Sequence, residues 1–146
     1  MNTAGDEKSK NFFKSKLEQN GFTVFDWDSK IEKGVKRGDL IGVKNNRIYY
    51  FELKQRYVPS TKYNDLLITL DKQWLVDSYG GNVCFVFFFN DGVGYMLKAN
   101  TPPDSTGVEY MKKTTMFFNN DKVQKHYASW KPERAKKFKF DANLIY

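Results

Sequence analysis

Apolar side chains recur along the chain with two different periods, which predicts both helices and strands. In residues 6–20 they fall at helical spacing, and Gly21 follows as a residue that commonly ends a helix. Residues 22–27 alternate apolar and polar side chains, as in a short strand. Residues 65–79 again carry apolar side chains at helical spacing, and residues 83–89 form a continuous apolar run. A run of that length predicts a strand that is covered on both faces.

Two hairpins are also predicted. Residues 40–43 and 48–53 are rich in β-forming side chains, and Asn45-Asn46 between them suits a two-residue turn. A second turn at residues 90–92 leads into a strand at residues 93–97. The predicted order is therefore α-β-β-β-α-β, a mixed sheet flanked by helices in an α/β fold.

Length and composition predict one globular domain. The chain has 146 residues, 40% of them hydrophobic, which is enough for a single core over about residues 6–98. Residues 104–146 are expected to form a basic C-terminal extension. No apolar run is long enough to cross a membrane, and the first residues do not resemble a secretory signal. The single cysteine, Cys84, excludes an internal disulfide, so we expect a protein of a reducing cytoplasm. The compact, aromatic-rich and lysine-rich chain would suit a phage, so the expected cytoplasm is that of a bacterium or a phage-infected host.

The charge is concentrated in one segment. The 24 Lys and Arg residues exceed the 17 Asp and Glu residues, giving a net charge of +7, and the whole excess lies in residues 112–139. There, nine basic residues are interleaved with aromatic ones, a composition that suits nucleic acid. Structure signals are weak in this segment, with a strand near residues 114–118 and short helices expected. A solvated surface over core aromatics is the alternative, and membrane surfaces or acidic proteins stay open as partners.

The first predicted hairpin gathers charged side chains. A two-residue turn at Asn45-Asn46 places Asp39 opposite Glu52, and the strand period of two puts Lys54 on the same face. Two adjacent carboxylates repel each other unless they are protonated or hold a cation, and hard oxygen ligands suit Mg²⁺ or Mn²⁺. The backbone carbonyl of Leu53 could be a further ligand. From spacing alone, an ordinary cross-strand ion-pair cluster is an equally good interpretation.

The same residues carry a family resemblance. Asp39, followed after twelve residues by Glu52-Leu53-Lys54, resembles the motif of the PD-(D/E)XK nuclease superfamily, with Gly38 in place of the motif's proline. Residues 49–56 in particular resemble Holliday-junction resolvases and related phage or restriction endonucleases. The resemblance covers about residues 7–97 and implies a restriction-endonuclease-like core.

The resemblance also implies roles for individual residues. Asp39 and Glu52 would bind the metal, Lys54 would be the catalytic lysine, and Glu7 would join them from the first helix, with Glu18 as the alternative. Basic and amide side chains near the motif or in the basic segments are candidates for contacts with nucleic acid. These candidates are Lys36, Arg37, Gln55, Arg56, Lys72, Gln73, Lys136 and Lys137. An ordinary solvated surface is the alternative for them.

The expected function is Mg²⁺-dependent hydrolysis of phosphodiester bonds by a DNA endonuclease that prefers branched DNA, acts as a homodimer and could come from a phage. Restriction, homing or nicking endonucleases are alternatives, as is a non-catalytic nucleic-acid-binding protein. The sequence has no GxxxxGK[ST] or GxGxxG motif, so no nucleotide cofactor is expected. With His126 as the only histidine, sites built from several histidines are excluded.

Overall fold

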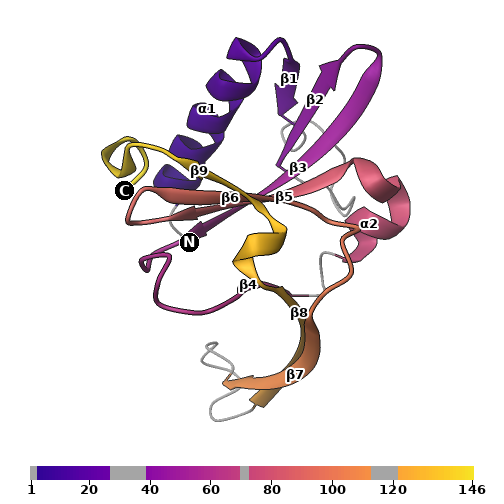
Figure 1. The fold of residues 1–146 in the computed structure, drawn as a ribbon, viewed down its shortest axis with the longest axis vertical. Helices are drawn as coiled ribbons and strands as arrows, with labels where there is room; N and C mark the ends of the chain where they lie inside the picture. Colours follow the sequence, from indigo (N-terminus) through magenta and orange to yellow (C-terminus); the bar gives the residue numbers. More distant parts are fainter. Residues whose placement is uncertain (1–2, 27–38, 70–72, 113–121) are drawn as a thin grey trace.

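A computed structural model describes residues 3–26, 39–69, 73–112 and 122–146 (Figure 1). The helices are α1 (Thr3–Gln19) and α2 (Gln73–Tyr79), and the short 3-10 helices are η2 (Gly80–Asn82), η4 (Pro132–Arg134) and η5 (Ala142–Leu144). The strands are β1 (Thr23–Asp26), β2 (Leu40–Lys44), β3 (Arg47–Arg56), β4 (Leu66–Thr69), β5 (Val83–Phe89), β6 (Val93–Lys98), β7 (Ser105–Lys112), β8 (Lys122–Trp130) and β9 (Lys136–Lys139).

The main sheet has six strands in the order β1-β2-β3-β5-β6-β9. Within the described ranges, β3 and β5 pair in parallel, and the other neighbours in this sheet are antiparallel. Asn45 and Asn46 both have positive φ, 52° and 64°, so the β2–β3 turn has the two-residue geometry that matches strand twist. Lys44 pairs with Arg47 as expected. The predicted fold class, a mixed sheet with flanking helices, is confirmed.

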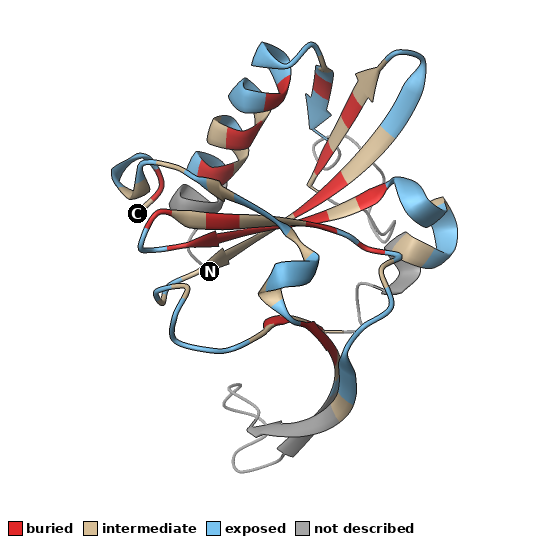
Figure 2. Cartoon of the chain, in the orientation of Figure 1, coloured by how far each residue is buried: buried red, intermediate tan, exposed pale blue. Residues whose placement is uncertain are grey.

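The main sheet has α1 on one face and the second sheet on the other (Figures 1 and 2), and an apolar cluster fills each side. On one face, α1 packs Phe13 and Leu17 against Phe51 and Phe88 of the sheet. On the other face lie α2 and a second sheet, of order β4-β8-β7. Alternate residues of β5 enter the two layers, so this strand is buried on both sides as its continuous apolar run predicts.

The helix predicted over residues 65–79 is wrong in its first half. Residues Leu66–Thr69 form β4, which pairs antiparallel with β8. Leu66 and Ile68 are 1% and 2% exposed, while the residues between and after them are half-buried, a period of two that fits a strand. Only Gln73–Tyr79 is helical, and residues 70–72 lie outside the described part of the chain.

Residues 104–146, expected as a basic C-terminal extension, contribute strands to both sheets. Strand β9 pairs with β6, where the Phe138 ring lies directly against Gly94, a position without a side chain. Ile145 is buried in the layer beneath α1. Strands β7 and β8 form most of the second sheet, and residues 114–118, expected to form a strand, fall outside the described residues.

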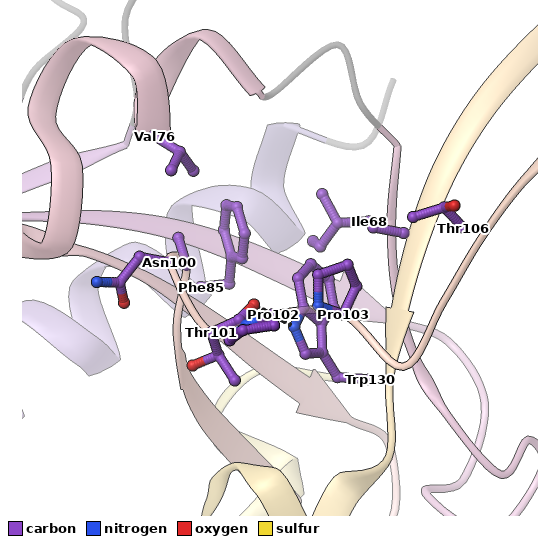
Figure 3. A pocket seen from close by; sticks show the side chains of 11 residues that line it. Ile68, Val76, Phe85, Asn100, Thr101, Pro102, Pro103, Thr106 and Trp130 are labelled. Atoms are coloured by element: carbon purple, nitrogen blue, oxygen red, sulfur yellow. Dashed lines mark hydrogen bonds between the residues drawn. The ribbon is translucent and has the colours of Figure 1, made fainter.

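A cavity of about 330 Å³ lies between the two sheets where they pack together (Figure 3). Apolar side chains such as Phe85, Ile68 and Trp130 line it, and the indole N–H of Trp130 donates a 2.8 Å hydrogen bond to the carbonyl of Thr101. The cavity therefore belongs to the packing between the sheets. In the described ranges, no helix has the length and apolar character needed to cross a membrane.

Candidate functional site

Asp39 is held at the start of β2 by two contacts with β3. Its backbone N–H donates to the carbonyl of Phe51 at 3.3 Å, and its Oδ2 accepts a 2.7 Å hydrogen bond from the backbone N–H of Leu53. The observed pairing of Leu40 with Phe51 puts Asp39 opposite Glu52, as the turn geometry predicts. The carboxylate of Asp39 is thus fixed beside the backbone of the Glu52-Leu53-Lys54 segment.

Glu52 is a buried carboxylate whose charge is balanced by Lys54. Glu52 is only 4% exposed, and the Lys54 Nζ lies 3.6 Å from its Oε1. Burying an ionised carboxylate costs free energy unless an opposite charge or hydrogen bonds compensate it. The two residues project from one face of β3, toward the layer that contains α2 and the second sheet. The structure therefore brings Asp39, Glu52 and Lys54 together.

A cleft of about 580 Å³ begins at Lys54 and runs along the end of β3 toward the second sheet. Lys54 and Arg56 contribute two positive charges to its wall, and Asp65 contributes a negative one. Tyr63, which is 61% exposed, and Tyr127 also line it. The cleft has the size of a typical ligand site and presents cations beside the carboxylates, which suits a phosphate-containing ligand.

Arg56 ties the cleft to the second sheet. Its Nη2 donates a 2.6 Å hydrogen bond to the carbonyl of Leu67 in β4, and its guanidinium lies 5.7 Å from the centre of the Phe87 ring. Burial lowers the pKa of Arg56, and the nearby Tyr146 acts against that shift. Arg56 therefore has a structural contact as well as a place in the cleft.

The donor set at Asp39 and Glu52 fits a hard divalent cation. Both residues offer carboxylate oxygens, and Mg²⁺ is commonly held by one or two carboxylates together with water and substrate phosphate. Across the described ranges, no group of three or more His, Cys, Asp or Glu side chains gathers. The structure therefore adds neither Glu7 nor Glu18 to this pair, and a catalytic role for Glu7 stays a prediction. So does the expected role of the Leu53 carbonyl.

The other candidates for contacts with nucleic acid are dispersed. Gln55 faces the opposite layer, because it alternates with Lys54 and Arg56, and its amide is buried with no hydrogen-bond partner among the described residues. Lys136 and Lys137 are exposed on β9, three strands or about 14 Å from β3. Gln73 begins α2. Lys36, Arg37 and Lys72 lie outside the described residues.

Sequence reasoning missed the aromatic wall of the cleft. Tyr63 lies in the loop after β3, and Tyr127 lies in β8 directly opposite Thr69. In the same strand, Ala128, Ser129 and Trp130 alternate between apolar and polar side chains in the sequence, and all three are buried. That alternation was the available signal for a strand, whereas no sequence signal marks Tyr63.

Comparison with known proteins finds a likeness in structure and none in sequence. No protein-family model matches the sequence, and no curated protein matches it either. Among solved structures, the fold is similar to that of Hjc, a Holliday junction resolvase of the archaeon Archaeoglobus fulgidus. That likeness has a TM-score of 0.47 and 11% sequence identity, and covers 61% of this chain and 73% of Hjc.

Proposed function

We propose that this chain is a metal-dependent DNA endonuclease of the PD-(D/E)XK type, with branched DNA as its preferred substrate. The observation that supports the proposal is the meeting of Asp39, Glu52 and Lys54 on one face of the β2–β3 hairpin, at the mouth of a cationic cleft. These are the positions at which the sequence resembles the superfamily. The preference for branched DNA rests on that resemblance alone.

The proposed cofactor is Mg²⁺, with Mn²⁺ able to replace it, held by the carboxylates of Asp39 and Glu52. If bound there, such a cation would supply Lewis-acid polarisation of the scissile phosphate. The Lys54 Nζ lies 3.6 Å from the Glu52 Oε1, and Lys54 lines the cleft. Its ammonium group can therefore stabilise the negative charge that develops on the phosphate. Glu52 in turn holds Lys54 in place.

The cleft beside Lys54 is the proposed entry for the DNA strand. Lys54 and Arg56 provide the positive charge, while Tyr63 and Tyr127 offer rings against which a base can pack. The net charge of +7 supports attraction to a polyanion. We further propose a homodimer, since two active sites would be needed to cut two strands of a junction.

The test is cleavage of end-labelled four-way junction, linear duplex and single-stranded DNA with Mg²⁺, with Mn²⁺ and with a chelator. Wild type is compared with Glu52→Gln, which keeps the shape of the side chain and removes its charge. Lys131→Ala serves as the control, because Lys131 is an exposed lysine outside the cleft. We expect metal-dependent cuts, strongest on the junction, that Glu52→Gln abolishes and Lys131→Ala retains.

Three results would contradict the proposal in whole or in part. Binding of DNA without cuts under every metal condition would indicate a non-catalytic binding protein. Cuts that persist in Glu52→Gln would place the active site elsewhere. Cuts on linear duplex alone would support the nuclease assignment but overturn the preference for branched DNA. Sedimentation of the full chain with and without junction DNA tests the dimer.

A further inference from the structure

A groove crosses the main sheet on the face opposite to the candidate active site. Two adjoining hollows of about 480 and 510 Å³ form it, and they share Leu17, Phe22, Met96 and Lys136 in their walls. Helix α1 packs over β1, β2 and β3. The groove lies beside it, with residues of α1 on one wall and Met96 of β6 and Phe138 of β9 on the other.

The floor of the groove is apolar. Phe22, Tyr49 and Met96 are half-buried there, and Phe51 lies beneath them. Phe22 meets the rings of Tyr49 and Phe51 edge to face, at centroid distances of 5.7 and 6.2 Å. An apolar surface that is shielded only in part favours a ligand that brings apolar groups of its own.

The rim of the groove is positively charged. Its cations come from α1, β2, β6, η4 and β9, and they are Lys16, Lys44, Lys98, Arg134, Lys136 and Lys139. Among the described lining residues there is no carboxylate. Arg134 is paired with Asp104 at 3.4 Å, so the lysines supply most of the uncompensated charge. This charge would attract an anionic partner.

The ring faces of the groove favour a peptide over a nucleic acid. The Lys16 ammonium lies 5.7 Å from the centre of the Phe12 ring, and the Lys44 ammonium lies 5.3 Å from that of Phe22. Bases that stack on these rings would first have to displace the ammonium groups. A peptide can instead place apolar side chains on the floor and pair its carboxylates with the lysines without displacing them.

We propose that this groove binds an acidic peptide segment of a partner protein, with bulky apolar side chains on the floor and carboxylates on the lysine rim. The site is separate from the Asp39, Glu52 and Lys54 face, so a partner could bind while DNA occupies the cleft. The groove would then serve to recruit the protein to its place of action. This role is independent of whether the chain cuts DNA.

Fluorescence anisotropy of the full chain with the labelled peptide Asp-Asp-Asp-Asp-Leu-Phe tests the proposal. The matched variants are Lys136→Glu and Lys137→Glu, which make the same change at adjacent exposed residues of β9. Lys136 pairs with Met96 and lines the groove, whereas Lys137 pairs with Tyr95, which packs in the opposite layer. We expect about tenfold weaker binding with Lys136→Glu and little change with Lys137→Glu.

Further variants and probes make the result decisive. Lys16→Glu, on the α1 wall, should weaken binding as Lys136→Glu does, and replacing Leu-Phe of the peptide by Ala-Ala should abolish it. Circular dichroism confirms that each variant is folded. Equal binding by the Lys136 and Lys137 variants, or no binding by wild type, would overturn the proposal. It would also be overturned if single-stranded DNA displaced the peptide from the groove and lost affinity with Lys136→Glu.

Discussion

Oδ2 of Asp39 accepts a 2.7 Å hydrogen bond from the backbone N–H of Leu53, the residue between Glu52 and Lys54. The side chain of Asp39 thereby binds the β3 backbone where a neighbouring strand would otherwise do so. One carboxylate thus has two separable properties, an acceptor that organises the hairpin and a charge that can hold a cation.

Substitutions at Asp39 should separate these two properties. Asp39→Asn keeps an oxygen acceptor for Leu53, so we expect near wild-type stability and loss of metal-dependent cleavage. Asp39→Ala removes the acceptor as well and should lower the free energy of unfolding by about 1–3 kcal/mol. Urea titrations of both variants, with cleavage assays beside them, check this. Equal destabilisation by the two variants would argue against the hydrogen bond to Leu53.

Lys54→Ala should abolish cleavage and leave DNA binding largely intact. The loss of a group that stabilises developing charge commonly costs about a hundredfold or more in rate. The same change leaves buried Glu52 without the ammonium that now lies 3.6 Å away, and should destabilise the fold. Adding Glu52→Gln should therefore restore part of the stability but no cleavage. Thermal unfolding of the single and double variants measures this coupling, and independent, additive losses would contradict it.

Cys84 should make the fold less stable at high pH. Burial raises the pKa of its thiol from 9.0 to about 12, so the native state keeps a proton that the unfolded chain releases. Between these values stability falls as pH rises, by about 1.4 kcal/mol per pH unit for one proton. Cys84→Val should make this decrease of stability with pH less steep, by the contribution of about one proton. Urea titrations from pH 8 to about 11 test it, and identical slopes for the two proteins would contradict it.

Tyr146→Phe should loosen the ends of β3 and β5 together. The Tyr146 hydroxyl lies 2.7 Å from the carbonyl of Arg56 and 2.5 Å from that of Phe88, so its single proton can be donated to either strand or shared between them. Its loss should cost about 1 kcal/mol of stability. Amide hydrogen exchange near Arg56 and Phe88 should quicken, while exchange in α1 stays as in wild type. Uniform acceleration across the chain would indicate general destabilisation instead.

The β2–β3 hairpin and its charged cluster could be predicted because the residues that determine them lie close together in the sequence. A two-residue turn at Asn45-Asn46 fixes every pair along β2 and β3, so Asp39 and Glu52 follow from counting. The apolar run of β5 likewise indicates its own burial. By contrast, Leu66–Thr69 become a strand only because β8 lies beside them, and that partner comes much later in the chain. Helical spacing of leucines could not reveal it.

The place of the C-terminal segment in the main sheet was harder to predict. Lys137, Phe138, Lys139 and Phe140 alternate as in a strand, but composition alone indicates only a mixture of basic and aromatic side chains that suits nucleic acid. Net charge is a sum over residues and carries no information on their order, so it does not reveal the period of two. The same charge count could not show that Lys136 and Lys137 point to different faces, one of them into the groove.

Strand β5, with the sequence VCFVFFF, has no polar face. In the native protein both faces are covered, and neighbouring strands satisfy both edges. While the chain is unfolded, the same segment is a short, uncharged, β-prone sequence of the kind that pairs with copies of itself. Refolding yield should therefore fall steeply with protein concentration, and the speed with which β3 and β6 enclose β5 would decide between folding and aggregation.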